Sequence, residues 1–137
     1  MTTIDTLLTL DADDPALRRG IAEMLGYHLV DQEEGWIIYP PPDAPREVED
    51  RWRYDRVHLK PEDAWPTAMT MLPDWPHSVD AALTLLPPLP SAIIISRVIE
   101  GWYVGINTMS SRLRDISEGR SDNLALAICR AWLASKR

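Results

Sequence analysis

The chain has 137 residues, of which 45% are hydrophobic and 26% are charged, and this composition is ordinary for a single globular domain and wrong for a disordered chain. The formal net charge of -7 argues against a general nucleic-acid binder, because affinity for DNA depends on cations that neutralise phosphates. The single cysteine, Cys129, excludes an internal disulfide, and no apolar run reaches the roughly 20 residues of a membrane helix.

The first part of the chain predicts two helices followed by a hairpin. Asp14 is a suitable N-cap for the second helix, and Gly26 a suitable end. Gly35 can supply the positive φ of a short hairpin loop. The predicted elements are a helix over residues 3–10, a helix over residues 14–25, and strands over residues 27–31 and 36–39.

The second part repeats this order after a long connection. Prolines interrupt residues 40–76, which show no sustained periodicity and predict a long irregular connection. Ser78 is the expected cap of a following helix, and Ser121 that of the last helix. The remaining predicted elements are a helix over residues 78–86, strands over residues 92–99 and 102–107, a loop over residues 108–120, and a helix from residue 121 to the end.

This order of elements predicts an α/β fold of the α+β kind. Two hairpins joined by a long connection most simply give a four-stranded, largely antiparallel sheet covered by helices. We therefore expect residues 1–137 to form one domain. The lack of a signal-peptide pattern in the first residues favours a reducing compartment.

Three segments resemble the bacteriophage ABA sandwich domain family. They are residues 17–26 (LRRGIAEMLG), residues 72–82 (LPDWPHSVDAA) and residues 124–133 (LALAICRAWL). The resemblance covers most of the chain but stops at the tryptophan- and arginine-rich stretch of residues 46–66. It implies a helix-sheet-helix sandwich and a small phage accessory protein that acts in the cytoplasm of the infected host. It implies no catalytic residues.

The best candidate for a ligand site is the stretch that interleaves bases with aromatic rings. Guanidinium groups can hold a phosphate while flat rings stack on a nucleobase. Three further arginines lie before the last helix, whose N-terminal amides could help to bind an anion. The alternative interpretation is a solvated loop whose arginines pair with nearby acids. The candidate residues are Trp52, Arg53, Tyr54, Arg56, Arg112, Arg114 and Arg120.

Other candidates are each weighed against a structural role. Asp74, His77 and Asp80 could hold a divalent metal or act as acid and base, or they could simply cap a helix and complement its dipole. Cys129 is expected to be a buried thiol rather than a nucleophile. The proline-flanked tryptophans could be partner anchors, and these are Trp65 and Trp75.

The common catalytic and cofactor signatures are absent from the sequence, so we expect a binding protein that uses no cofactor. The leading hypothesis is an anti-defence protein that sequesters a small phosphate-bearing ligand, such as a nucleotide signal of host immunity. One alternative is a protein that inhibits a host defence or replication factor, and another is a small metal-dependent hydrolase. We expect a small anionic ligand or a host protein as partner, neither long nucleic acid nor a membrane, and a chain able to form a homo-oligomer.

Overall fold

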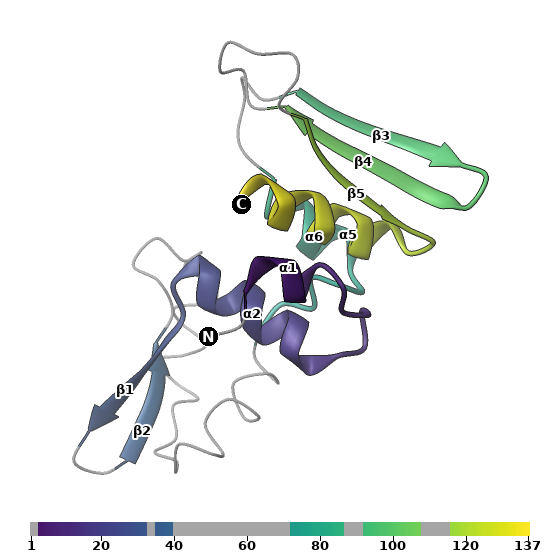
Figure 1. Ribbon diagram of the computed structural model, residues 1–137. Helices are drawn as coiled ribbons and strands as arrows, with labels where there is room; N and C mark the ends of the chain where they lie inside the picture. The colour runs from purple at the N-terminus through teal and green to yellow at the C-terminus, as the bar shows by residue number, and fades with distance from the viewer. Residues whose placement is uncertain (1–2, 33–34, 40–71, 87–91, 108–115) are drawn as a thin grey trace. The chain divides into compact units, whose positions relative to one another are not determined.

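The computed structural model describes residues 3–32, 35–39, 72–86, 92–107 and 116–137 (Figure 1). The chain forms two compact units. The sheet unit combines residues 1–17 with residues 73–137, and the hairpin unit contains residues 18–72. The described elements are α1 (Ile4–Leu7), α2 (Pro15–Leu25), β1 (His28–Gln32), β2 (Gly35–Tyr39), α5 (Val79–Leu83), β3 (Ala92–Val98), β4 (Gly101–Asn107), β5 (Ile116–Ser121) and α6 (Leu124–Ser135).

Helix α2 begins and ends where the sequence predicts. The Asp14 side chain accepts a hydrogen bond of 2.9 Å from the backbone N–H of Ala16, which satisfies a free donor of the first turn. At the other end Gly26 adopts a positive φ of 108°, and the Tyr27 N–H bonds the carbonyl of Ala22 at 3.0 Å. This Schellman arrangement stops the helix and turns the chain into β1.

The hairpin unit carries a two-stranded antiparallel sheet. Strand β1 pairs with β2 from His28 opposite Tyr39 to Gln32 opposite Gly35. The predicted hairpin is therefore confirmed, with β1 shifted by one residue from its expected range and β2 beginning one residue earlier than expected. Within the same unit the Arg18 guanidinium donates a hydrogen bond to the carbonyl of Leu72.

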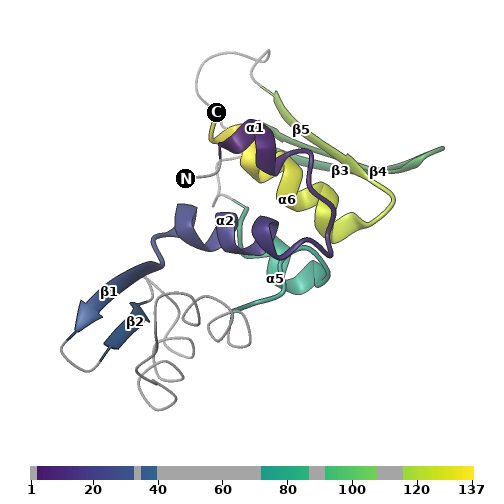
Figure 2. The ribbon, with the colours of Figure 1, turned by 60° about the horizontal axis from the view of Figure 1, so that its bottom comes forward.

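The sheet unit is built on a three-stranded antiparallel sheet in the order β3-β4-β5. Helix α6 lies along one face of it, against β5 and β4 (Figure 2). Val104 and Ile106 of β4 are completely buried on that face, together with Ile128 and Leu133 of α6. These side chains form the core of the unit.

Gly119 on β5 explains how close helix and sheet come. A Cβ at this position would lie 2.1 Å from the carbonyl oxygen of Ala127 and 2.4 Å from the backbone nitrogen of Ala131, both on α6. Real Cβ atoms do not approach backbone so closely, so only glycine permits this packing. The absence of a side chain thus lets the helix backbone rest directly on β5.

The loops of the sheet unit are tied to α6 by polar contacts. Asn123 is the N-cap of α6, and its side-chain amide also donates to the carbonyl of Pro76 at 2.8 Å. Arg130 donates to the carbonyls of Arg120 at 2.8 Å and Leu10 at 3.2 Å. These bonds connect α6 to β5, to the segment before α5 and to Leu10, which follows α1.

The predicted four-stranded sheet is wrong for the described part of the chain. Strands β1 and β2 pair only with each other there, and the second hairpin instead gains β5 as its third strand. We expected a loop over these residues, because Ser117, Glu118, Gly119 and Arg120 carry no strand pattern. Pairing with β4 and packing under α6 make this segment a strand against its own weak propensity.

Two smaller expectations are corrected and one is confirmed. The last helix is capped by Asn123, because Ser121 is still part of β5. The helix after Ser78 is capped as expected, since the Ser78 hydroxyl accepts from the Ala81 N–H at 3.2 Å, but it ends at Leu83. Except for residues 72–76, the predicted long connection lies outside the described residues.

Candidate binding surface

Six of the seven residues predicted to bind an anionic ligand lie outside the described part of the chain. They are Trp52, Arg53, Tyr54, Arg56, Arg112 and Arg114. The seventh, Arg120, lies on β5 and faces Tyr103 of β4. The convergence of these residues on one pocket therefore stays a prediction.

Arg120 belongs to a small polar group on the sheet face opposite α6. Its guanidinium carbon lies 5.3 Å from the centre of the Tyr103 ring. The Tyr103 hydroxyl donates a hydrogen bond of 2.9 Å to Glu118, and this bond, with some burial, raises the pKa of Tyr103. Because the Glu118 carboxylate lies beside the same ring, it weakens the attraction of Arg120 for an anion.

The sheet also exposes most of the large apolar side chains of β3. Ile93 is 37% exposed, Ile94 50% and Ile95 42%, and Val98 is exposed as well. Side chains alternate along a strand, and Ile95 is paired with the buried Val104, so Ile93 and Ile95 point to the α6 side and Ile94 to the other. Strand β3 thus exposes apolar side chains on both of its faces.

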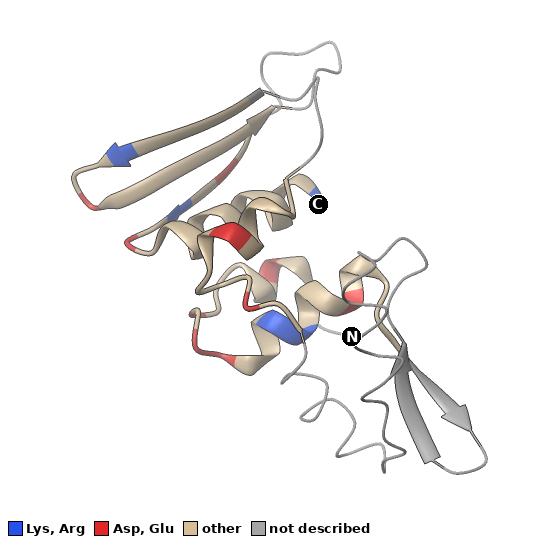
Figure 3. Cartoon of the chain, turned by 180° about the vertical axis from the view of Figure 1, so that it is seen from behind, with Lys and Arg blue, Asp and Glu red and all other residues tan. Residues whose placement is uncertain are grey.

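Strand β3 is an edge of the sheet. Among the described strands it pairs only with β4, from Ala92 opposite Asn107 to Val98 opposite Gly101. An edge strand carries backbone N–H and C=O groups on its open side, and proteins usually protect such edges with charged residues or proline. Residues 92–96 contain neither, and Figure 3 shows charge on this strand only near its C-terminal end.

The one charged side chain of β3 is directed toward its neighbouring strand. The Arg97 guanidinium carbon lies 5.2 Å from the centre of the Trp102 ring on β4. Such a cation–π contact holds the charge over the sheet face. The open side of β3 is therefore uncharged along its whole isoleucine run.

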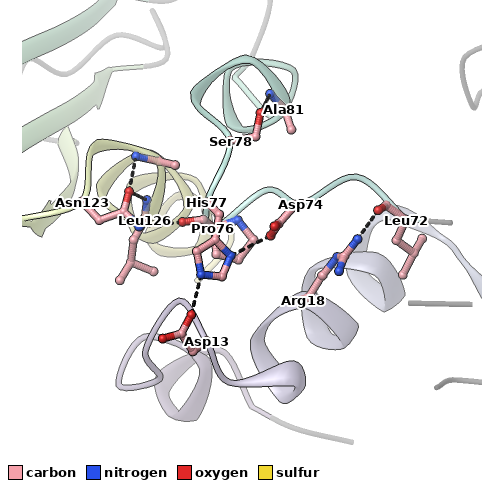
Figure 4. A network of polar contacts seen from close by, with 11 residues as sticks. Asp13, Arg18, Leu72, Asp74, Pro76, His77, Ser78, Ala81, Asn123 and Leu126 are labelled. Atoms are coloured by element: carbon pink, nitrogen blue, oxygen red, sulfur yellow. Dashed lines mark hydrogen bonds and ion pairs between the residues drawn. The ribbon is translucent and has the colours of Figure 1, made fainter. Parts of the chain in front are cut away.

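A polar cluster in the sheet unit joins His77 to two carboxylates (Figure 4). The Nδ1 atom of His77 lies 2.8 Å from Asp74, and its Nε2 atom lies 2.6 Å from Asp13. The bonds to Asp74 and then Asp13 raise the pKa of His77, because both ring nitrogens donate only in the protonated form. His77 thus links Asp13, which lies just before α2, to Asp74, which lies in the segment before α5. We call these three residues the His77 clasp.

This geometry differs from the metal site that we weighed for Asp74, His77 and Asp80. The second nitrogen of His77 bonds Asp13, and Asp80 lies in the first turn of α5, where a carboxylate complements the helix dipole. In the described ranges no three acidic, histidine or cysteine side chains are grouped as metal ligands would be.

Two further candidates are buried. Burial raises the pKa of Cys129 to about 12, so the thiol stays protonated and unreactive at neutral pH, as expected for a structural thiol. Trp75, considered as a partner anchor, is completely covered together with Pro76, so that interpretation is wrong. Trp65 lies outside the described residues.

The exposed edge is the feature that sequence reasoning missed. The run Ile93-Ile94-Ile95 predicts a strand, and apolar residues on both faces are typical of a strand buried inside a sheet. The neighbouring proline-rich segment, Pro87-Pro88-Leu89-Pro90, was a usable signal for an edge position, because proline is confined to edges and strand ends.

Comparisons with protein-family models, with curated proteins and with solved structures find no match to this chain. The resemblance to the phage family therefore stays a prediction. In the residues that the structure describes, no helix is both long and apolar enough to cross a bilayer.

Proposed function

We propose that this chain is a non-enzymatic binding protein that holds a protein partner on the β3-β4-β5 sheet. The observation that carries the proposal is the exposure of Ile93, Ile94 and Ile95 on an edge strand. Grouped apolar side chains at the surface mark interaction sites, because leaving them in water costs free energy that a partner recovers. The infected bacterial cell, implied by the family resemblance, is the setting that we propose with it.

This proposal favours the protein-binding alternative over the small-ligand hypothesis. The anion-binding hypothesis depends on arginines and aromatic residues of which only Arg120 is described, and Arg120 lies beside the carboxylate of Glu118. In contrast, the structure describes all three isoleucines of the apolar edge. The hydrolase alternative has less support, because the described residues hold no metal-type group and His77 bonds Asp74 and Asp13 rather than Asp80.

Affinity capture with matched variants tests the proposal. The immobilised chain, presented with lysate of phage-infected bacteria, should retain a protein in stoichiometric amount. Ile94→Lys should abolish that retention, because a lysine at the centre of the surface cannot be buried without a partner charge. Val79→Lys is the matched control, since Val79 is 38% exposed but lies on α5, outside the sheet.

Two results would contradict the proposal. One is retention that Ile94→Lys leaves unchanged, and the other is equal loss in Ile94→Lys and Val79→Lys. At protein concentrations where the parent chain is monomeric, both variants should keep its melting temperature, because both replace exposed side chains.

A further inference from the structure

We propose that the protein partner of the sheet is a second copy of this chain. The two copies pair β3 with β3 in antiparallel orientation and form one continuous six-stranded sheet. The inference rests on the proposed function, because it names the partner of the same exposed edge.

The open backbone of β3 gives the first reason. Every copy carries the same seven-residue edge, Ala92–Val98, and among the described strands only β4 pairs with it. In an antiparallel ladder a two-fold axis can relate two identical strands, so that each supplies the donors that the other lacks. A second copy therefore satisfies this edge without any additional sequence requirement.

The side chains of β3 are self-complementary about Ile94. With the two-fold axis at Ile94, that residue faces its own copy, and Ile93 faces Ile95. Facing residues in an antiparallel pair lie on the same face of the sheet. Four isoleucines, two from each copy, thus meet on the α6 side, and the two Ile94 side chains meet on the other.

The single charge of the strand is compatible with this register and disfavours registers centred closer to Arg97. An axis at Ile94 separates the two Arg97 positions by six residues, about 20 Å along the strands. This distance exceeds the Debye length of about 8 Å at physiological ionic strength, so repulsion between them is screened. An axis at Ser96 would bring the two arginines within two residues of each other.

The position of Arg97 favours pairing in a second way. Charged side chains on an edge normally discourage another strand from adding to it. Here the guanidinium is held over Trp102, on the strand away from the open side. The edge is left without a charge that would exclude an identical strand.

The net charge of the chain predicts how dimerisation should depend on salt concentration. Two copies that each carry -7 repel one another at long range, while the contact itself is apolar and uncharged. Added salt screens the repulsion and leaves apolar burial intact. Self-association through β3 should therefore strengthen as salt concentration rises, opposite to an interface held by ion pairs.

Sedimentation equilibrium of the full chain measures this directly. The parent chain and Val79→Lys should form dimers with equal dissociation constants. Ile94→Lys should raise the dissociation constant at least about tenfold, because two lysines would face each other on the axis. A parent chain that stays monomeric overturns the inference, as does a dimer indifferent to Ile94→Lys.

Chemical cross-linking tests the register independently of affinity. Ile94→Cys should give a covalent dimer with a short bis-maleimide, because facing Cβ atoms on the axis are about 4.5–5.5 Å apart. Ile99→Cys is the control, since Ile99 is fully exposed but lies beyond the strand. Equal cross-linking of both variants contradicts the register. The native Cys129 is buried and should not react.

The two proposals fail in different ways. A monomeric parent chain that still captures another protein through Ile94 overturns self-pairing and leaves the proposed function standing. A dimer that Ile94→Lys disrupts, together with a capture experiment that retains no protein other than this chain, supports both proposals, because the second copy is then the partner. A monomer that captures nothing contradicts both.

Discussion

Helix α6 and strand β3 are both strongly apolar segments of the sheet unit, yet they lie in opposite environments. Eight of the twelve residues of α6 are buried, whereas Ile93, Ile94 and Ile95 of β3 all remain exposed. The helix is covered because Gly119 lets its backbone approach β5, and it packs against β5 and β4, whereas Ile93 and Ile95 on the same side of β3 stay more than a third exposed. Burial thus depends on which neighbour can approach, and apolar composition alone does not decide it.

A pair of isoleucine substitutions gives the largest expected contrast. Ile128→Ala on α6 should lower the free energy of unfolding by about 2–5 kcal/mol, because it leaves a cavity in a closely packed core. Ile94→Ala on β3 should change it by less than about 0.5 kcal/mol in a monomeric sample, because its side chain is already half in water. Urea denaturation at low protein concentration measures both. Similar losses of unfolding free energy in the two variants would contradict the proposed difference between α6 and β3.

A pair of glycine substitutions tests why α6 is close to the sheet. Gly119→Ala should lower the free energy of unfolding by an amount near the upper end of about 1–3 kcal/mol, because its Cβ would collide with the backbone of α6. Gly105→Ala on β4 should cost less, because its Cβ would meet the Tyr103 hydroxyl at 3.0 Å and an Ile116 methyl at 3.2 Å, and side chains can move. Thermal melts compare the two, and an equal loss would mean that the helix approach is not limited by Gly119.

The sequence predicts those elements whose signals are local. The Asp14 cap, the Gly26 end and the Ser78 cap all depend on residues within one turn, and each lies where expected. Strand β5 depends instead on a partner strand and on a helix that follows it. Glu118, Gly119 and Arg120 therefore carry no strand signal, and the sheet was predicted with the wrong members.

The candidate surface could be predicted only in part. A strand of three isoleucines is evident from sequence, but whether it is central or at an edge depends on the number and order of the other strands. His77 shows the same limit, because its contact with Asp74 is local whereas Asp13 lies 64 residues away along the chain. Contacts between residues so far apart in the sequence depend on the complete fold, and no short sequence pattern predicts them.

The smallest expected effect is that of the His77 clasp on the free energy of unfolding. Measuring it tests whether exposed polar contacts contribute much less to stability than the buried side chains of α6. His77 has a raised pKa in the folded chain, so protonation favours folding. The stabilisation is fully present below the unfolded pKa of about 6.5 and is lost as pH rises through the folded value. Because the side chains are well exposed, solvent screening limits it to less than about 1 kcal/mol.

The difference in unfolding free energy between the parent chain and His77→Gln isolates this contribution from other titrating groups. It should be largest near pH 6 and should shrink toward pH 9, since neutral imidazole can donate to only one of Asp13 and Asp74. Added salt should reduce it at the lower pH, because both pairs are exposed. A difference that grows with pH would mean that the neutral ring is the form held between the two carboxylates.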